Sequence, residues 1–262
     1  MKVSAIQMNM KFEDPDANFI KAEELIRQAA NDKPDTIVLP ETWNTGFFPV
    51  ENRMELADDN GKRTKILFSS LSKELNVNII AGSIVNKKED GLYNSSYIFN
   101  RDGECIAEYD KTHLFSYMHE DDYFNKGKNV TVFELDGIKC GIIICYDIRF
   151  LELVRTLTLQ GIKILFVVAQ WPVPRINHWE ILNKARAIEN QIFVVNVNSC
   201  GVAGKTIYGG NSSILNPWGE VLAKGDSDET IITAELNMEI VDEIRNTINV
   251  YNDRRNELYK IN

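Results

Sequence analysis

The sequence has few cysteines and histidines and no long apolar run. Its 262 residues include four Cys and three His. No Cys-x-x-Cys pair occurs, which excludes a zinc ribbon or a thioredoxin-like redox motif, and four cysteines are too few for a disulfide scaffold of this length. Free thiols in a reducing cytoplasm are therefore expected. A run of roughly 18 apolar residues is absent, as is a signal-peptide core, so no membrane partner is expected.

Positive charge is also scarce. Lys and Arg number 29 against 38 Asp and Glu, which gives a formal net charge of −9. Because a nucleic-acid-binding surface needs cations to replace the counterions of the phosphates, no nucleic-acid partner is expected. The chain is 44% hydrophobic and 26% charged, as folded globular proteins are. Its length suits one domain, which we expect to span residues 1–262.

Short β-branched apolar runs alternate with helical patterns. Continuous runs such as Ile164–Val168 are typical of strands buried on both faces. Strands are predicted at residues 3–7, 36–39, 77–82, 95–100, 104–110, 131–135, 138–144, 162–169, 192–198, 211–215, 221–223 and 229–235. Helices are predicted after Asp14-Pro15 and at residues 62–75, 149–160 and 177–190. The pattern predicts a layered α/β sandwich, with residues 247–262 as an arm that packs on a partner.

Three reactive side chains follow predicted strands, at the edge where open α/β sheets bind ligands. Glu41 comes after Thr36–Leu39 and Pro40, although a surface glutamate is the ordinary alternative. Lys111 follows another strand. A lysine there is usually solvated, but a fixed ammonium can stabilise an oxyanion. Cys145 ends a buried run at a strand-to-helix elbow, where a helix N-terminus would lower the thiol pKa from about 8.5 toward 7.

A small core residue is the alternative interpretation of Cys145, and it is the one we assign to the three other cysteines. Cys105, Cys140 and Cys200 lie in predicted strands or a loop without such an elbow.

Three motifs occur in order: Pro40-Glu41, Asp110-Lys111-x-His113-Leu114-Phe115 and Cys145-Tyr146-Asp147-x-Arg149-Phe150. Together they resemble the nitrilase, or carbon–nitrogen hydrolase, superfamily. The likeness runs from Ile6-Gln7-Met8-Asn9 through Ala185-Arg186-Ala187-Ile188-Glu189-Asn190 to Asp253-Arg254-Arg255. It implies a four-layer αββα fold, no cofactor, and a triad with Glu41 as general base, Lys111 as electrophilic stabiliser and Cys145 as nucleophile.

The resemblance assigns further residues around this triad. The family's second glutamate is assigned to Glu120, next to Asp121 and Asp122. The backbone N–H of Tyr146 is expected to hold the oxyanion together with Lys111. Because a free glutamate is too weak a base for a thiol, Glu41 is expected to be partly buried with Glu120 nearby as a like charge. Leu151 stands where many relatives have proline, which should affect entry into the helix.

A further motif indicates the substrate. In Gln170-Trp171-Pro172-Val173-Pro174-Arg175, Trp171 is expected to wall the pocket and Arg175 to bind a carboxylate, with an ion pair as the alternative for Arg175. Tyr117, Phe47 and Phe48 are further candidate walls, with core packing as the alternative. The amino-acid sequence of this motif resembles that of the ω-amidase branch of the superfamily, whose members deamidate monoamides of dicarboxylic acids such as 2-oxoglutaramate. Since relatives commonly dimerise, a homodimer or higher homo-oligomer is expected.

Other interpretations stay open at this point. The same triad acts on N-carbamoyl amides, nitriles or deaminated glutathione in relatives. A Cys–His protease would need a histidine beside Cys145, and a catalytically silent interaction module would have no reason to keep all three triad residues. His113, His119, Asp121 and Asp122 match no zinc spacing, so no metal is expected. His113 is expected to orient the lysine loop instead, and Arg186 to pair with Glu189.

Overall fold

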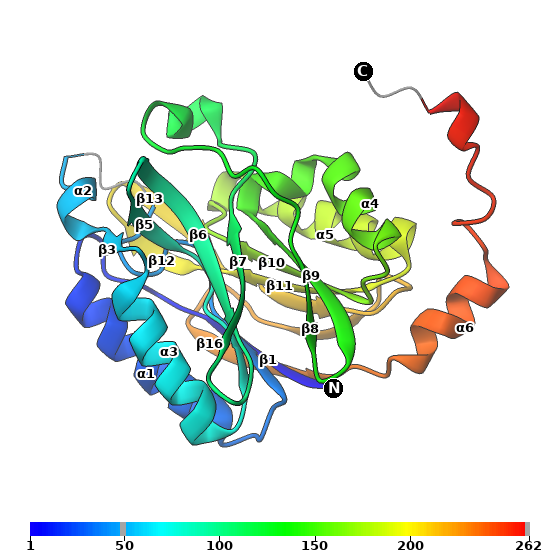
Figure 1. Cartoon of the computed structure of the whole chain (residues 1–262), viewed down its shortest axis with the longest axis horizontal. Coiled ribbons are helices and arrows are strands. Elements are labelled where there is room, and N and C mark those ends of the chain that lie inside the picture. Colours follow the sequence, from blue (N-terminus) through cyan, green and yellow to red (C-terminus); the bar gives the residue numbers. More distant parts are fainter. Residues whose placement is uncertain (48–50, 260–262) are drawn as a thin grey trace.

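Two β-sheets packed face to face form the centre of the protein, in a computed structural model that describes residues 1–47 and 51–259 (Figure 1). Within these residues the first sheet has eight strands, in the order β16 (Thr230–Glu235), β1 (Lys2–Gln7), β2 (Thr36–Val38), β4 (Asn78–Ile80), β6 (Gly91–Phe99), β5 (Ile84–Lys88) and β3 (Asp58–Asp59), with β7 (Cys105–Asp110) paired to β6. The six-stranded second sheet runs β15 (Val221–Lys224), β14 (Ser213–Leu215), β11 (Phe193–Asn198), β10 (Ile164–Ala169), β9 (Ile138–Ile144) and β8 (Val132–Leu135). A separate hairpin joins β12 (Cys200–Ala203) to β13 (Thr206–Gly209).

Helices cover the outer faces of both sheets. The first sheet carries α1 (Pro15–Ala30) and α3 (Lys62–Leu75), and the second carries α4 (Leu151–Leu159) and α5 (Ile176–Asn190) (Figure 1). At the start of α1 the Asp14 side chain accepts a hydrogen bond from the backbone of Ala17 at 3.0 Å, which satisfies one of the free N–H groups of the first turn. The four-layer αββα fold expected from the sequence is confirmed.

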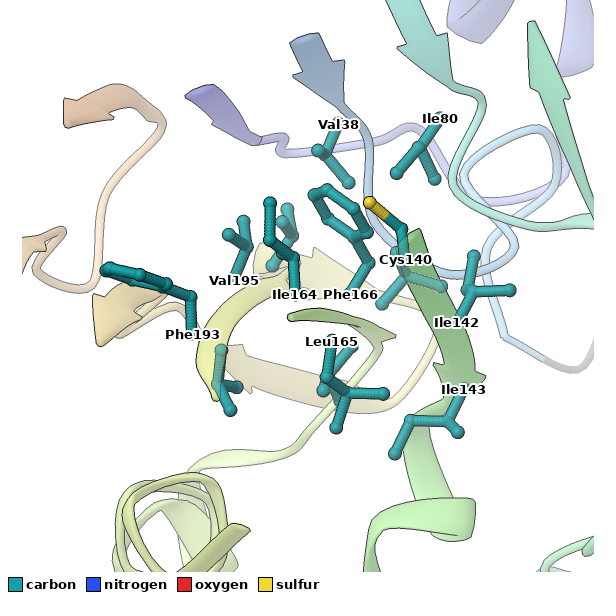
Figure 2. Close-up of a cluster of buried hydrophobic side chains, with 14 of the residues drawn as sticks. Val38, Ile80, Cys140, Ile142, Ile143, Ile164, Leu165, Phe166, Phe193 and Val195 are labelled. Atoms are coloured by element: carbon teal, nitrogen blue, oxygen red, sulfur yellow. The ribbon is translucent and has the colours of Figure 1, made fainter. Parts of the chain in front are cut away.

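The main core lies between the two sheets. Val38 and Ile80 of the first sheet meet Ile142, Phe166 and Val195 of the second, and all are fully buried (Figure 2). A second cluster packs α1 and α3 against the other face of the first sheet, with Trp43 and Phe68 among its largest members. Strand β10 is buried along its whole length, as its continuous apolar run predicts.

Strand direction brings the three motifs to one edge of the sandwich. Strands β1, β2 and β4 are parallel, and β7 has the same direction because β4, β6 and β7 pair antiparallel in turn. In the second sheet β9, β10 and β11 are parallel. The carboxyl ends of β2 and β7 precede Glu41 and Lys111, and the end of β9 precedes Cys145.

Several elements differ from the sequence-based expectation. Strands β3, β5, β12 and β13 were not predicted, because they are short or lie beside positive-φ glycines such as Gly82 and Gly204. Helix α6 (Glu239–Thr247) was also missed, and only Val241 and Ile244 of its residues are buried. Helix α4 begins at Leu151 instead of residue 149, because residues 145–149 form a separate 3₁₀ turn. In the described part of the chain, no helix is both long and apolar enough to cross a bilayer.

The short elements lie in the connections and near the end of the chain. A brief helix, α2 (Arg53–Leu56), precedes β3, and 3₁₀ turns occupy Ser116–Met118, Glu120–Asp122, Cys145–Arg149, Val173–Arg175 and Asn256–Leu258. After α6 the chain runs away from the two sheets (Figure 1), and its last described residues line a groove together with α4. The hydroxyl of Tyr251 donates to the backbone carbonyl of Asn190 and so fixes the start of this segment to the end of α5.

Candidate active site

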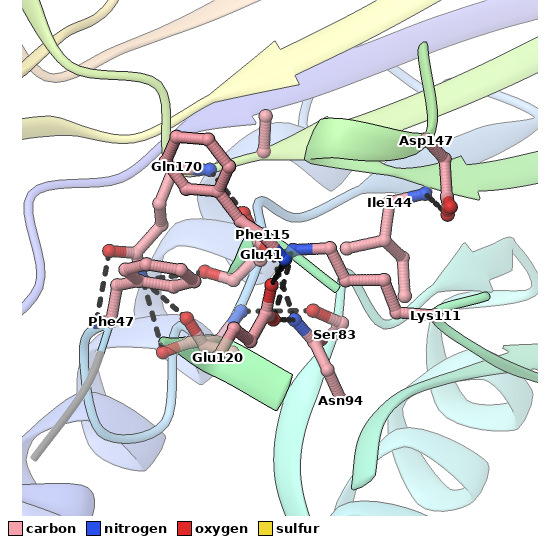
Figure 3. A network of polar contacts seen from close by, with 12 residues as sticks. Glu41, Phe47, Ser83, Asn94, Lys111, Phe115, Glu120, Ile144, Asp147 and Gln170 are labelled. Carbon is pink, nitrogen blue, oxygen red and sulfur yellow. Dashed lines mark hydrogen bonds and ion pairs between the residues drawn. The ribbon is translucent and has the colours of Figure 1, made fainter. Parts of the chain in front are cut away.

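Glu41 is fully buried and accepts hydrogen bonds on both carboxylate oxygens (Figure 3). Its Oε1 receives Lys111 Nζ at 2.9 Å and Asn94 Nδ2 at 2.8 Å. Its Oε2 receives the backbone N–H of Gln170 at 2.7 Å. The Gln170 side chain also donates to the Glu41 carbonyl at 2.8 Å. The loop after β2 is thereby tied to the loop after β10, which belongs to the other sheet.

Lys111 lies between two buried carboxylates. Its Nζ is 2.9 Å from Glu41 Oε1 and 2.9 Å from Glu120 Oε2, and all three side chains are essentially inaccessible to solvent (Figure 3). Burial by itself would lower the lysine pKa, but the charges of Glu120 and Glu41 outweigh it and raise the pKa well above the usual value. Lys111 is therefore an ammonium, and it is the positive partner shared by the two carboxylates.

Glu120, and neither of its aspartate neighbours, faces Lys111. It lies in a 3₁₀ turn after the lysine loop, and its Oε2 accepts the backbone N–H of Phe115 at 2.6 Å. Burial raises the Glu120 pKa, while the ammonium of Lys111 opposes that effect. Asp121 and Asp122 are exposed. The structure thus brings Glu120, and neither Asp121 nor Asp122, into contact with Lys111.

Cys145 stands at the end of β9 with a positive φ of 48°. This strained left-handed conformation turns the chain sharply, and the residue remains 8% exposed within a cleft. The expectation of a lowered thiol pKa is wrong: burial raises the pKa well above its usual value, Glu41 raises it further, and only Lys111 opposes. The physical reason is that helix α4 begins only at Leu151, so desolvation outweighs any helix-terminus effect.

Asp147 connects the lysine loop to the cysteine turn, a role that the sequence analysis missed. This buried carboxylate accepts the backbone N–H and the Nδ1 of His113 at 2.9 and 2.8 Å, Thr112 Oγ1 at 3.0 Å, and the Tyr109 hydroxyl at 2.7 Å. It also accepts the backbone N–H of Ile144 at 3.0 Å, on the cysteine strand (Figure 3). An acidic residue directly after a buried strand was the available signal.

His113 and Arg186 hold the same region in place. The His113 ring stacks on Phe150 with centroids 3.7 Å apart. Arg186 pairs with Glu189 at 2.8 Å and also donates two hydrogen bonds to the carbonyl of Ile148, in the turn that starts at Cys145. In the part of the chain that is described, no three His, Cys, Asp or Glu side chains gather in a way that could hold a metal ion.

Cys145 opens into a cleft with mostly apolar and aromatic walls. Its empty space, including the open mouth, is about 390 Å³. The lining comprises Phe47, Phe115, Met118, Cys145, Tyr146, Arg149, Gln170, Trp171, Pro172, Arg175, Thr206 and Tyr208. Two of these, Thr206 and Tyr208, come from the hairpin that the sequence analysis did not predict. A cleft with mostly apolar walls and a few polar groups is typical of sites that bind small molecules.

Two guanidinium groups line the cleft. Arg149 lies over the Trp171 ring at 4.9 Å, and Arg175 lies over the Phe115 ring at 5.4 Å. Among the ion pairs of the described residues, neither arginine has a carboxylate partner. Tyr117 does not line the cleft: it is 77% exposed and contacts Arg175 from outside. Phe48, the other candidate wall, lies outside the described residues.

A buried thiol, an ammonium and two carboxylates beside a small-molecule cleft are the groups expected of a hydrolase that acts on carbon–nitrogen bonds. In such an arrangement a thiol can act as a nucleophile, a carboxylate can act as a base, and an ammonium can stabilise an oxyanion.

Comparison with known proteins identifies the family. The carbon–nitrogen hydrolase family model matches residues 2–246, so the chain belongs to that family. It is 41% identical over 257 residues to a 2-oxoglutaramate amidase of Bacillus subtilis, covering 98% of each chain. It is 32% identical to an omega-amidase NIT2 of Danio rerio, covering 94% of this chain and 91% of that one. The crystal structure of Saccharomyces cerevisiae Nit3, of the nitrilase superfamily, superposes with a TM-score of 0.90 at 28% identity, covering 97% and 96%. The protein is thus a hydrolase of non-peptide carbon–nitrogen bonds.

Proposed function

We propose that the protein hydrolyses the terminal amide of small dicarboxylic monoamides, such as 2-oxoglutaramate, to the acid and ammonia. The observation that carries this proposal is the cleft itself, whose lining includes Cys145 and two guanidinium groups without carboxylate partners among the described ion pairs. An ω-amide substrate has an amide at one end and a carboxylate at the other. The names of the relatives from Bacillus subtilis and Danio rerio favour the same class.

The first half of the reaction forms a thioester. Because burial keeps the Cys145 thiol protonated at rest, a base must act as the substrate binds, and Glu41 accepts the thiol proton. The sulfur attacks the amide carbon, and the oxygen of the tetrahedral intermediate takes up negative charge beside Lys111 and the backbone N–H of Tyr146. Glu41 then passes its proton to the amide nitrogen, the C–N bond breaks, and ammonia leaves.

The second half releases the acid. A water molecule takes the place of ammonia, and Glu41 removes one of its protons as its oxygen attacks the thioester carbonyl. The same donors stabilise the second oxyanion. When the C–S bond breaks, the proton held by Glu41 returns to the Cys145 sulfur, so every group ends as it began. Glu120 keeps its ion pair with Lys111 at 2.9 Å throughout and so fixes the position of the ammonium.

Arg175 and Arg149 bind the carboxylate of the substrate. Guanidinium groups suit this task because their planar donors match the two oxygens of a carboxylate. Trp171 forms the wall between them and is nearly buried. A neutral amide lacks a partner for either arginine and should therefore bind more weakly.

An ammonia-release assay over monoamides of three- to six-carbon dicarboxylic and keto acids tests the proposal. We expect acidic ω-amides to exceed neutral amides, and intact-mass analysis after a rapid quench to show an acyl adduct on the wild type. Cys145→Ala should abolish both, whereas Cys140→Ala, a buried cysteine on the same strand, should keep both. Full turnover by Cys145→Ala would refute the nucleophile. A preference for carbamoyl compounds, nitriles or deaminated glutathione would replace the substrate class, and no turnover of any compound would support a silent interaction module.

We also propose a homodimer through the outer face of α4 and α5, with residues 247–262 as an arm that reaches the second copy. Large apolar side chains are exposed on this face, namely Leu151, Leu159, Ile181 and Ile188. A groove between α4 and the arm is lined by Leu151, Leu159, Val250 and Leu258 among others. Light scattering coupled to size exclusion should give twice the mass of the chain, and Ile188→Lys should reduce it to one chain. A wild-type monomer would refute the proposal.

A further inference from the structure

Asn94 contacts all three residues of the buried cluster formed by Glu41, Lys111 and Glu120, two through their carboxylates and Lys111 through its backbone. It lies in β6 and is 1% exposed. Its side-chain Nδ2 donates to Glu41 Oε1 at 2.8 Å and reaches Glu120 Oε1 at 3.5 Å. Its backbone carbonyl accepts the N–H of Lys111 at 2.9 Å. One residue thus contacts two buried carboxylates and the backbone of the lysine between them, from three separate segments of the chain (Figure 3).

We propose that Asn94 is a positioning residue for the reaction: its amide group holds Glu41 and Glu120 around Lys111 and reserves one oxygen of Glu41 for the proton of Cys145. This inference rests on the proposed function in one respect only, namely that Glu41 is the base for Cys145.

The neighbours of the Asn94 side chain determine its orientation. Both groups that Nδ2 approaches are carboxylate oxygens, which only accept hydrogen bonds, so the NH₂ end must face them. The opposite rotamer would press the amide oxygen against two negative charges. In the observed orientation, Asn94 Oδ1 is buried and has no hydrogen-bond partner among the described residues. Since an unpaired buried oxygen costs stability, the favourable part of this side chain is its N–H contact with the carboxylates.

The hydrogen bonds to Glu41 distinguish its two oxygens. Oε1 receives both Lys111 Nζ and Asn94 Nδ2, which occupies the usual acceptor capacity of a carboxylate oxygen. Among the described residues, Oε2 receives the backbone N–H of Gln170, which leaves it one acceptor site for the Cys145 thiol, a hydrogen-bonding neighbour of Glu41. The proton of Cys145 should therefore move to Oε2. Without Asn94, Oε1 gains a free site and the choice of oxygen is lost.

The charges around Glu41 explain why an extra neutral donor matters. The groups that face it are the ammonium of Lys111, the carboxylate of Glu120, the Cys145 thiol and the Tyr208 phenol. Within the described part of the chain, Lys111 is the one cation paired with these groups, so two buried carboxylates have one ammonium between them. An N–H donor stabilises the ionised form of a carboxylate without adding charge. Asn94 provides that donor to Glu41.

The pH dependence of Cys145 alkylation tests the inference without any substrate. Iodoacetamide is applied to the full-length protein, and peptide mass spectrometry separates Cys145 from the other cysteines. In Asn94→Ala, loss of the donor should make the base hold its proton more tightly, so the acidic limb of the rate profile should move up by about one pH unit. Asn94→Asp keeps the side-chain volume and adds a third carboxylate, which should move the limb in the same direction.

Asn86→Ala is the matched control. Asn86 is also a buried asparagine of the same sheet, on the adjacent strand β5, and its Oδ1 also lacks a partner among the described residues. It donates to Ser95 and Tyr97 and contacts none of the charged cluster. Its removal should lower thermal stability without moving the acidic limb. Thermal unfolding of each variant is measured first, and the volume-preserving Asn94→Asp gives the profile if the alanine variant does not fold.

The outcomes separate this inference from the proposed function. An unmoved acidic limb in both Asn94 variants, even with reduced activity, would overturn the positioning role, as would an equal movement in Asn86→Ala. A moved limb specific to the Asn94 variants supports it, even if no ω-amide proves to be a substrate. If Glu41→Gln alkylates at Cys145 with the wild-type profile, Glu41 is not the base and both proposals fall together.

Discussion

Replacement of Lys111 by methionine tests the charge balance of the site. Methionine matches the length of the lysine stem and leaves no large cavity, so the main change is the loss of the ammonium. Two fully buried carboxylates, each 2.9 Å from that ammonium, then lose their only cationic partner among the described ion pairs. Removing one partner of a buried ion pair typically costs about 3–5 kcal/mol, and we expect a loss of unfolding free energy in that range at neutral pH.

The pH dependence identifies the origin of this loss. Burial and mutual repulsion raise the carboxyl pKa in the folded Lys111→Met protein above its unfolded value, and burial already raises the Glu120 pKa in the wild type. A group with a raised folded pKa contributes stability below its unfolded pKa and loses it as pH rises through the folded pKa. The destabilisation of Lys111→Met should therefore be smaller at about pH 5 than at about pH 8.

Urea unfolding followed by circular dichroism measures this difference. The double variant Lys111→Met/Glu120→Gln removes one of the two like charges and should recover part of the stability at high pH. An equal loss at both pH values, or no recovery in the double variant, would refute the electrostatic reasoning and indicate a packing defect. Ammonia release should fall at least about a hundredfold in both variants, because the oxyanion loses its fixed positive charge.

Four further predictions follow from the geometry. Arg175→Ala should raise KM for acidic ω-amides about tenfold or more and leave neutral amides unchanged, because it removes a charged contact with the carboxylate; an unchanged acidic preference in steady-state kinetics would contradict the carboxylate site. Asp147→Asn should lower kcat about a hundredfold with little change in KM, since the lysine loop and the cysteine turn lose their shared acceptor and the reacting groups shift; equal losses in kcat and in folded fraction would mean that the role is only structural. Glu41→Gln should slow iodoacetamide alkylation of Cys145 at least about tenfold, because the buried thiol loses its base, while exposed Cys105 is an internal control. Leu151→Pro should keep activity and should leave the unfolding free energy unchanged or raise it by up to about 1 kcal/mol, which thermal unfolding measures. The reason is that Leu151 is the first residue of α4 and the extended Phe150 before it suits proline.

The sandwich could be predicted from the sequence because most of its strands are marked by clear apolar runs. Continuous apolar runs such as Ile138–Ile144 leave little choice of structure, and helix α3 has the predicted bounds. The hairpin of β12 and β13 has no such signal: Val202 and Ile207 are exposed and pair with each other, so neither alternation nor burial marks it. Two residues of the cleft were missed together with this hairpin.

The residues of the cluster were easier to predict than its electrostatics. Glu41, Lys111 and Cys145 were singled out because each follows a predicted strand, and Glu120 was singled out because the family resemblance assigns it. The thiol pKa could not be predicted, because its direction depends on desolvation in three dimensions and on the distance to Glu41. Asn94 and Gln170 were missed for a similar reason: an amide side chain in a strand or loop has no sequence signature that separates a carboxylate contact from an ordinary core hydrogen bond.

The reactive groups are divided between the two halves of the sandwich. Glu41 and Lys111 follow strands of one sheet, whereas Cys145 and Gln170 follow strands of the other. The proposed nucleophile Cys145 and its proposed base Glu41 therefore follow strands of different sheets, and their alignment depends on how the two sheets pack around Phe166. A packing defect between the two sheets would separate the proposed base from the proposed nucleophile and so lower activity, even if each sheet kept its own hydrogen bonds. The activity of this protein should therefore respond to changes in the packing between its two sheets.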